Sequence, residues 1–198
     1  MSDGARHDEF DLLALVVRRL THDLASPMGA LMTALDLAEA PDPLATAAME
    51  SLAARLSLWR ALAGTLPDAP VDGPALRRGL AAEAARARGR SLEMPPIEDL
   101  PPRLARVVVL LALQGLGLLA GAGRVRAGQE AEGLVVRVEG RLSPGCEGLL
   151  RLRPGAPAGE SRWAPAALAL ALWPSLRFEQ GPDGFLLSVP RAPSADLR

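Results

Sequence analysis

The stretch from residue 12 to residue 37 constrains the fold more than any other part of this chain. Its leucine and valine residues recur every three or four positions, a spacing that predicts one long helix. They form a single apolar stripe: Leu13, Val16, Val17, Leu20, Leu24, Leu31 and Leu35. Because each residue turns a helix by about 100°, His22 falls on the opposite side. Its face also carries Arg18, Ala25, Gly29 and Asp36, with Ser26 beside it. We therefore expect an imidazole exposed to solvent, with small side chains one and two turns further on.

The residues around this histidine form a motif. The string His22-Asp23-Leu24-Ala25-Ser26-Pro27 resembles the phospho-acceptor motif of two-component histidine kinases and phosphotransferases, His-Glu/Asp-x-x-Ser/Thr/Asn-Pro. A proline inside a helix removes a backbone hydrogen bond and costs about 3 kcal/mol, so a chain that keeps Pro27 makes use of the bend. A lone histidine on a helix is usually a plain surface residue, but the surrounding string favours a functional role.

Composition excludes several classes of protein. A formal net charge of −1 argues against nucleic-acid binding, which needs a basic surface. All of the basic side chains are arginine, so no Walker-type lysine is available to grip phosphate. One cysteine, Cys146, and two histidines cannot build a disulfide or a histidine-rich metal site. The polar N-terminus lacks a signal-peptide pattern, and no unbroken apolar run reaches the roughly 18 residues of a membrane span. We expect a cytoplasmic protein with no membrane partner.

The proline-rich turn Pro41-Asp42-Pro43 predicts that the first helix ends near Ala40 and that an antiparallel one follows at 44–66. Its apolar residues also share one face: Leu44, Ala48, Leu52, Leu56, Trp59 and Leu62. Two helices alone leave apolar surface uncovered. Pairing two hairpins into a four-helix bundle would bury it, which predicts a homodimer through residues 8–66. The alternative is that the rest of the same chain folds back over the hairpin.

The remaining residues predict a second domain. We divide the chain into a helical dimerisation and phosphotransfer domain at 1–66, a linker at 67–74 and a second domain at 75–198. The latter alternates helices at 75–88, 101–119 and 163–173 with strands at 91–94, 123–127, 133–138, 176–180 and 185–189. Residues 143–157 are expected to be mostly loop, and Gly181–Gly184 a hairpin turn. This pattern predicts an α+β sandwich with its helices on one face of the sheet.

The order of hairpin and sandwich resembles the core of a histidine kinase, in which an ATP-binding domain follows the dimerisation domain. Kinases place an Asn-x-x-x-Asn run on the helix that matches 104–119, but only Gln114 is polar within 110–119, and the chain has no asparagine. The Asp-x-Gly that reads adenine is missing at Val138-Glu139-Gly140-Arg141, and 151–159 replaces the glycine-rich lid. The resemblance therefore implies a degenerate ATPase-like domain that does not bind ATP.

Over roughly residues 10–190 the chain resembles the ChpT-type bacterial histidine phosphotransferases. The resemblance rests on residues 18–30, on the degenerate ATP-domain pattern and on Gly159-Glu-Ser-Arg-Trp163 before an apolar helix. It implies that His22 takes a phosphoryl group from an aspartyl phosphate on the receiver domain of a hybrid histidine kinase and passes it to a response regulator. The chain itself would bind no cofactor and no metal, because the receiver brings Mg²⁺. Asp23 would accept a hydrogen bond from the second imidazole nitrogen and stabilise the developing charge.

The other candidate residues concern docking. Arg18 and Arg19 would pair with the acidic rim of a receiver site, and Ala25 and Gly29 would let the receiver approach closely. Ser26 would orient the phosphoryl group or a water; an ordinary solvated helix face is the competing interpretation for the two arginines and for Ser26. Two other functions stay open. They are an ATP-dependent histidine kinase fragment and a non-catalytic dimeric protein that binds receiver domains.

Overall fold

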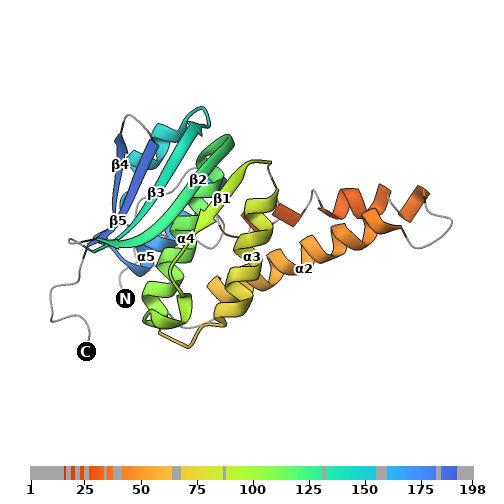
Figure 1. Cartoon of the computed structure of the whole chain (residues 1–198), viewed down its shortest axis with the longest axis horizontal. Helices are drawn as coiled ribbons and strands as arrows, with labels where there is room; N and C mark the ends of the chain where they lie inside the picture. The colour runs from red at the N-terminus through yellow and green to blue at the C-terminus, as the bar shows by residue number, and fades with distance from the viewer. Residues whose placement is uncertain are drawn as a thin grey trace, which may run out of the picture.

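The computed structural model confirms an α+β fold, in which helices cover one face of a sheet and a pair of helical segments projects from this body (Figure 1). It describes residues 16, 19–20, 23–24, 27–33, 35–37, 42–63, 68–86, 88–130, 133–154, 160–181 and 184–190.

The body is built on a five-stranded mixed sheet of order β1-β2-β3-β5-β4. Its strands are β1 (Arg90–Glu93), β2 (Leu119–Glu130), β3 (Gly133–Leu142), β4 (Arg177–Gly181) and β5 (Gly184–Pro190). β1 and β2 run parallel, and the other neighbouring strands are antiparallel. The strands predicted at 123–127 and 133–138 do pair, but both are longer than predicted. β2 begins at Leu119, directly after a helix. The prediction missed this start because the first half of β2 is rich in glycine and alanine and lacks a strand pattern. Residues 182–183 of the predicted hairpin turn lie outside the described residues.

Three helices cover the sheet or flank it: α3 (Gly73–Ala85), α4 (Pro102–Leu118) and α5 (Ala164–Leu172). α4 is buried on almost every side from Ala105 onward, as its predominantly apolar sequence predicts. Gly115 lets α4 approach the sheet closely, since a Cβ there would lie 2.9 Å from Cγ2 of Val138 on β3. α5 packs against α4 on the same face (Figure 1).

The bounds of α3 and the content of 143–157 differ from the prediction. α3 begins at Gly73 rather than at residue 75, because Asp72 Oδ1 accepts a hydrogen bond from the Ala75 N–H at 2.9 Å. Pro74 fits in this first turn, where its missing N–H costs nothing. The stretch at 143–157, expected to be loop, contains a 3₁₀ helix at Cys146–Arg151 that buries Leu149.

The projecting pair consists of α2 (Pro43–Ala63) and the helical residues 27–33 and 35–37, which lie alongside it in Figure 1. Asp42 caps the N-terminus of α2, since its Oδ1 accepts a hydrogen bond from the Leu44 N–H at 2.9 Å. The expected end of the first helix falls at residues 38–41, and that of the second helix at 64–66. Both stretches lie outside the described residues.

One hydrophobic core joins the base of this hairpin to the body. Val16, Leu58, Trp59 and Leu62 belong to the same buried cluster as Leu76 of α3 and most of α4. The rest of the chain therefore covers the base of the hairpin, whereas the distal part stays open. Among the described residues the large exposed apolar side chains all lie there: Met28, Met32, Leu35, Leu37, Leu44, Met49 and Leu56. The division into domains stays a prediction.

Leu35 differs from its predicted place on a buried stripe, because its side chain is 61% exposed within the chain. Near the base the buried positions are Val16, which the stripe predicted, and Asp23 and Pro27, which it did not. Leu13 and Val17 of the predicted stripe lie outside the described residues.

Candidate functional site

The predicted site belongs to the N-terminal helical residues at the base of the hairpin. Of its members the structure describes Arg19, Asp23 and Gly29. Arg18, His22, Ala25 and Ser26 lie outside the described residues, so their predicted roles stay predictions. The contacts of the described members show how this helical segment is attached to the rest of the protein.

Asp23 is buried in the interior of the protein, where it is only 2% exposed. Its Oδ2 lies 2.9 Å from Nε of Arg19, one helical turn earlier, and the Arg19 side chain is itself only 15% exposed. A buried carboxylate is tolerated only when it is paired and hydrogen-bonded, and Arg19 supplies such a partner. In this conformation the Arg19 guanidinium faces Asp23 rather than solvent.

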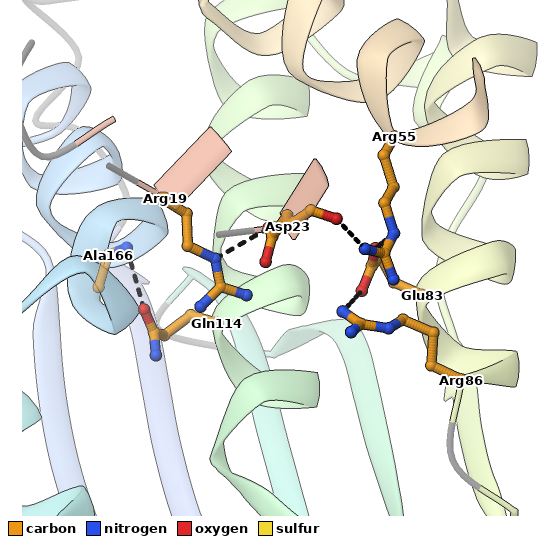
Figure 2. A network of polar contacts seen from close by, with 7 residues as sticks. All are labelled: Arg19, Asp23, Arg55, Glu83, Arg86, Gln114 and Ala166. Carbon is orange, nitrogen blue, oxygen red and sulfur yellow. Dashed lines mark hydrogen bonds and ion pairs between the residues drawn. The ribbon is translucent and has the colours of Figure 1, made fainter. Parts of the chain in front are cut away.

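A second arginine approaches the same turn from α2. Arg55 is 4% exposed, and its Nη1 donates a hydrogen bond to the main-chain oxygen of Asp23. Its Nε lies 2.9 Å from Oε1 of Glu83 on α3. Oε2 of Glu83 in turn accepts a hydrogen bond from Nη1 of Arg86 at 3.0 Å. Figure 2 shows these residues converging from the N-terminal helical residues, α2 and α3.

Burial lowers the pKa of the Arg55 guanidinium below its ordinary value, and the neighbouring Glu83 carboxylate opposes this by raising the pKa. Arginine starts from so high a value that Arg55 stays protonated at neutral pH. The network is therefore ionic, and it ties the turn that contains Asp23 to both α2 and α3.

Sequence reasoning missed Arg55 and Glu83, although the helical period contains a signal for Arg55. This residue lies seven positions from both Ala48 and Leu62, which are buried on the same face of α2. The same period therefore places Arg55 on the apolar face, where a charged side chain needs a partner. Nothing in the sequence indicated that this partner would be Glu83.

Gly29 lies on the face predicted for His22, two helical turns further on, and it is exposed. A Cβ built at Gly29 would meet no other atom within 4 Å. Asp36, predicted on the same face, is exposed as well. This face of the projecting hairpin is thus open for another molecule at the described positions.

Gln114, a polar residue on α4, makes a structural contact. It is buried, and its Oε1 accepts a hydrogen bond from the Ala166 N–H at 3.3 Å (Figure 2). Ala166 lies in the first turn of α5, where N–H groups lack helical partners. Trp163, the residue that precedes α5, makes no capping hydrogen bond through its side chain, so Gln114 supplies the missing acceptor.

The space beside Gln114 is small. A cavity of about 30 Å³ lies between α4, α5 and Arg19, and the buried Trp163 closes one side of it. Arg162 stacks over the Trp163 ring, with its guanidinium carbon 4.5 Å from the ring centre. Pockets for small molecules typically measure roughly 300–1,000 Å³, so this cavity has room for little more than water.

Two further observations apply to the part of the chain that the structure describes. In it, no three histidine, cysteine, aspartate or glutamate side chains gather as a metal site would require. Within the same residues, none of the helices has both the length and the hydropathy needed to cross a membrane. The expectation that the chain binds neither metal nor ATP stays a prediction.

No protein-family model matches this chain, and no curated protein matches its sequence. Among solved structures it is similar to one described as a bacterial phosphotransferase, determined at 1.7 Å, with a TM-score of 0.67. The two sequences are 20% identical, and the similarity covers 94% of this chain and 96% of the other. A likeness at this level of identity establishes the fold alone. Over nearly its whole length, then, the chain has the fold of a protein described as a bacterial phosphotransferase.

Proposed function

We propose that this protein is a histidine phosphotransferase of a bacterial two-component phosphorelay, with His22 as the phosphoryl carrier. One observation carries the proposal: a chain that contains His22-Asp23-Leu24-Ala25-Ser26-Pro27 shares its fold, over 94% of its length, with a protein described as a bacterial phosphotransferase. The exposed face at Gly29 supports the proposal, because a receiver domain needs open helix surface beside the histidine.

The chemistry needs little from this chain beyond a positioned nucleophile. A neutral nitrogen of the His22 imidazole attacks the phosphorus of an aspartyl phosphate on the donor receiver. The P–O bond to the aspartate breaks, and its electrons leave with the carboxylate. The second receiver reverses the step, as its aspartate takes the phosphoryl group and His22 returns to the neutral imidazole. Such transfers depend mainly on in-line positioning and charge neutralisation, which Mg²⁺ bound by the receiver supplies.

The degenerate second domain fits a relay without ATP. Two observations support this: Gln114 Oε1 is committed to the first turn of α5, and the cavity beside it measures only about 30 Å³. The phosphoryl group would therefore come from a receiver and not from a nucleotide bound by this chain.

We also propose that the protein is a homodimer through its hairpin. The support is the concentration of exposed apolar side chains along the distal hairpin, where Met32 is 62% and Leu35 is 61% exposed. Contiguous apolar surface of this kind typically marks an interface, and a second hairpin would cover it as a four-helix bundle.

The decisive experiment follows phosphate on the two histidines. The full chain is incubated with a panel of receiver domains carrying ³²P-aspartyl phosphate, and acid-labile label on this chain is measured. We expect His22→Ala to abolish labelling while circular dichroism shows the same helix content. His7→Ala is the matched control, because His7 and His22 are the only histidines in the sequence. It should leave the labelling unchanged.

Persistent label on His22→Ala would overturn the proposal. Stable complexes with receivers but no label on the wild-type chain would instead identify a protein that sequesters receivers. Labelling by ATP alone, together with ATP binding in a calorimeter, would identify a kinase fragment.

A further inference from the structure

Pro27 leaves one main-chain oxygen of the motif without its usual donor. In an α-helix the carbonyl of residue i accepts a hydrogen bond from the N–H of residue i+4. For Asp23 that residue is Pro27, which has no N–H, and its ring also presses on the carbonyl one turn earlier. Both residues are helical and buried, so bulk water cannot serve as the donor.

Arg55 fills this place. Its Nη1 donates to the Asp23 main-chain oxygen from a position 32 residues away in the sequence. Hydrogen bonds from charged donors are roughly twice as strong as neutral ones, and an unsatisfied buried acceptor is costly. Pro27 and Arg55 therefore act together: Pro27 leaves the Asp23 carbonyl without its helical donor, and Arg55 donates to that carbonyl.

The same guanidinium is fixed at its other end. Its Nε lies 2.9 Å from Oε1 of Glu83 on α3, and Arg86 holds the second oxygen of that carboxylate at 3.0 Å. Arg55 thus bridges the turn that contains Asp23 to a helix of the body. With all three of Asp23, Arg55 and Glu83 less than one-tenth exposed, the bridge is shielded from solvent ions.

We propose that Arg55 is a positioning residue for phosphotransfer, which binds the carbonyl released by Pro27 and so fixes the turn next to His22 relative to α3. This rests on the proposed function of His22. In this proposal Arg55 acts through the turn that contains Asp23 and not by contact with the reacting groups. Arg55 affects the rate through the position of the imidazole relative to the phosphorus that it attacks. A misplacement of about 1 Å can lower such a rate by on the order of 10²-fold.

The test is a double-mutant cycle on the full chain with Arg55→Met and Pro27→Ala. Arg55→Met should lower the single-turnover rate of transfer from a phosphorylated receiver by about 10²-fold, with little change in receiver affinity. Pro27→Ala restores an N–H at position 27 that can bind the Asp23 carbonyl within the helix. In that background Arg55→Met should therefore cost less than about twofold in rate. The drop in Tm should also be smaller, while the part due to the lost ion pair with the buried Glu83 remains.

Arg77→Met is the matched control. Arg77 lies on α3 and pairs with Glu98, but its side chain is 52% exposed, so its loss should leave Tm and rate unchanged. Glu83→Gln separates the two ends of the bridge, because it removes the ion pair and leaves the Arg55 hydrogen bond to Asp23 possible.

Equal losses from Arg55→Met with and without Pro27→Ala would overturn the proposal, since a residue that only packs or pairs with Glu83 is not rescued by an N–H at position 27. If even the wild-type chain takes up no phosphate, the proposed function fails. The Tm cycle then still decides whether Arg55 binds the released carbonyl.

Discussion

Asp23, Arg55 and Glu83 occupy positions that face the core, and they are stable there only as a set. Each charge loses its hydration on burial. Arg19 returns part of that loss to the Asp23 carboxylate, and Arg55 and Glu83 do so for each other. Removing one member of such a set leaves an uncompensated charge and costs about 3–5 kcal/mol in other proteins. Substitutions here therefore test chemistry only when stability is measured beside activity.

Asp23→Asn keeps the size of the side chain and removes its charge. We expect it to slow phosphoryl transfer through His22 by about 10²-fold, in the range of losses for residues that assist proton transfer. Single-turnover labelling by a phosphorylated receiver measures this rate.

Arg19→Gln is the matched control, since it breaks the same Arg19–Asp23 ion pair from the other side. If Asp23 acts on the imidazole, Asp23→Asn slows transfer much more than Arg19→Gln does. Equal effects, or an unchanged rate in Asp23→Asn, would remove Asp23 from the chemistry and leave it a structural role.

At the scale of elements, the contact between α2 and α3 is close because Gly79 has no side chain. A Cβ built at Gly79 would lie 2.6 Å from Cβ of Leu58, an atom that cannot move without moving α2. The two helices are joined by the bridge between Arg55 and Glu83 at the same interface. Packing and charge therefore fix together how the hairpin leaves the body.

Gly79→Ala should destabilise the protein by about 1–3 kcal/mol, the usual cost of overpacking a core. Gly29→Ala makes the same chemical change on an open helix face and should stabilise by up to about 1 kcal/mol through helix propensity. Urea unfolding of both variants gives the comparison. A Gly79→Ala chain as stable as Gly29→Ala would mean that the helices are not in close contact.

Elements with a strong internal pattern were predictable from sequence. α4 is predominantly apolar and lies within one residue of each predicted end, and β1 also lies within one residue of its predicted bounds. The first half of β2 was not predictable, because Leu119–Gly123 has little strand propensity of its own. It is held at its two ends, where Leu119 pairs with β3 and Gly123 pairs with both β1 and β3, with a register shift between them. The candidate site divides in the same way. The motif at His22 is continuous in the sequence and could be predicted. The contact with Arg55 could not, because Arg55 reaches the Asp23 main-chain oxygen from 32 residues away through the tertiary structure.

At the scale of the whole molecule, the exposed apolar side chains of the hairpin contrast with a body whose apolar residues are well covered. Leu35 and Met32 lie on the projecting part, beyond the core that joins hairpin and body. In a single chain this surface would stay in water, and pairing with a second copy would remove it.

We expect light scattering after gel filtration to give twice the mass of one chain for the wild type. Met32→Glu with Leu35→Glu should give single-chain mass at the same concentration, because a dimer would bury these charges without partners. Ala81→Glu, which adds a carboxylate at an exposed position on α3, should leave the mass unchanged. A wild-type chain with single-chain mass would contradict the homodimer.

The side-chain amide of Gln114 sets how the start of α5 is held against α4. Gln114→Asn would shorten the side chain by one methylene and withdraw the oxygen from the Ala166 N–H, so the first turn of α5 would lose its acceptor. The length of this one buried side chain therefore limits which polar residues α4 can carry at position 114.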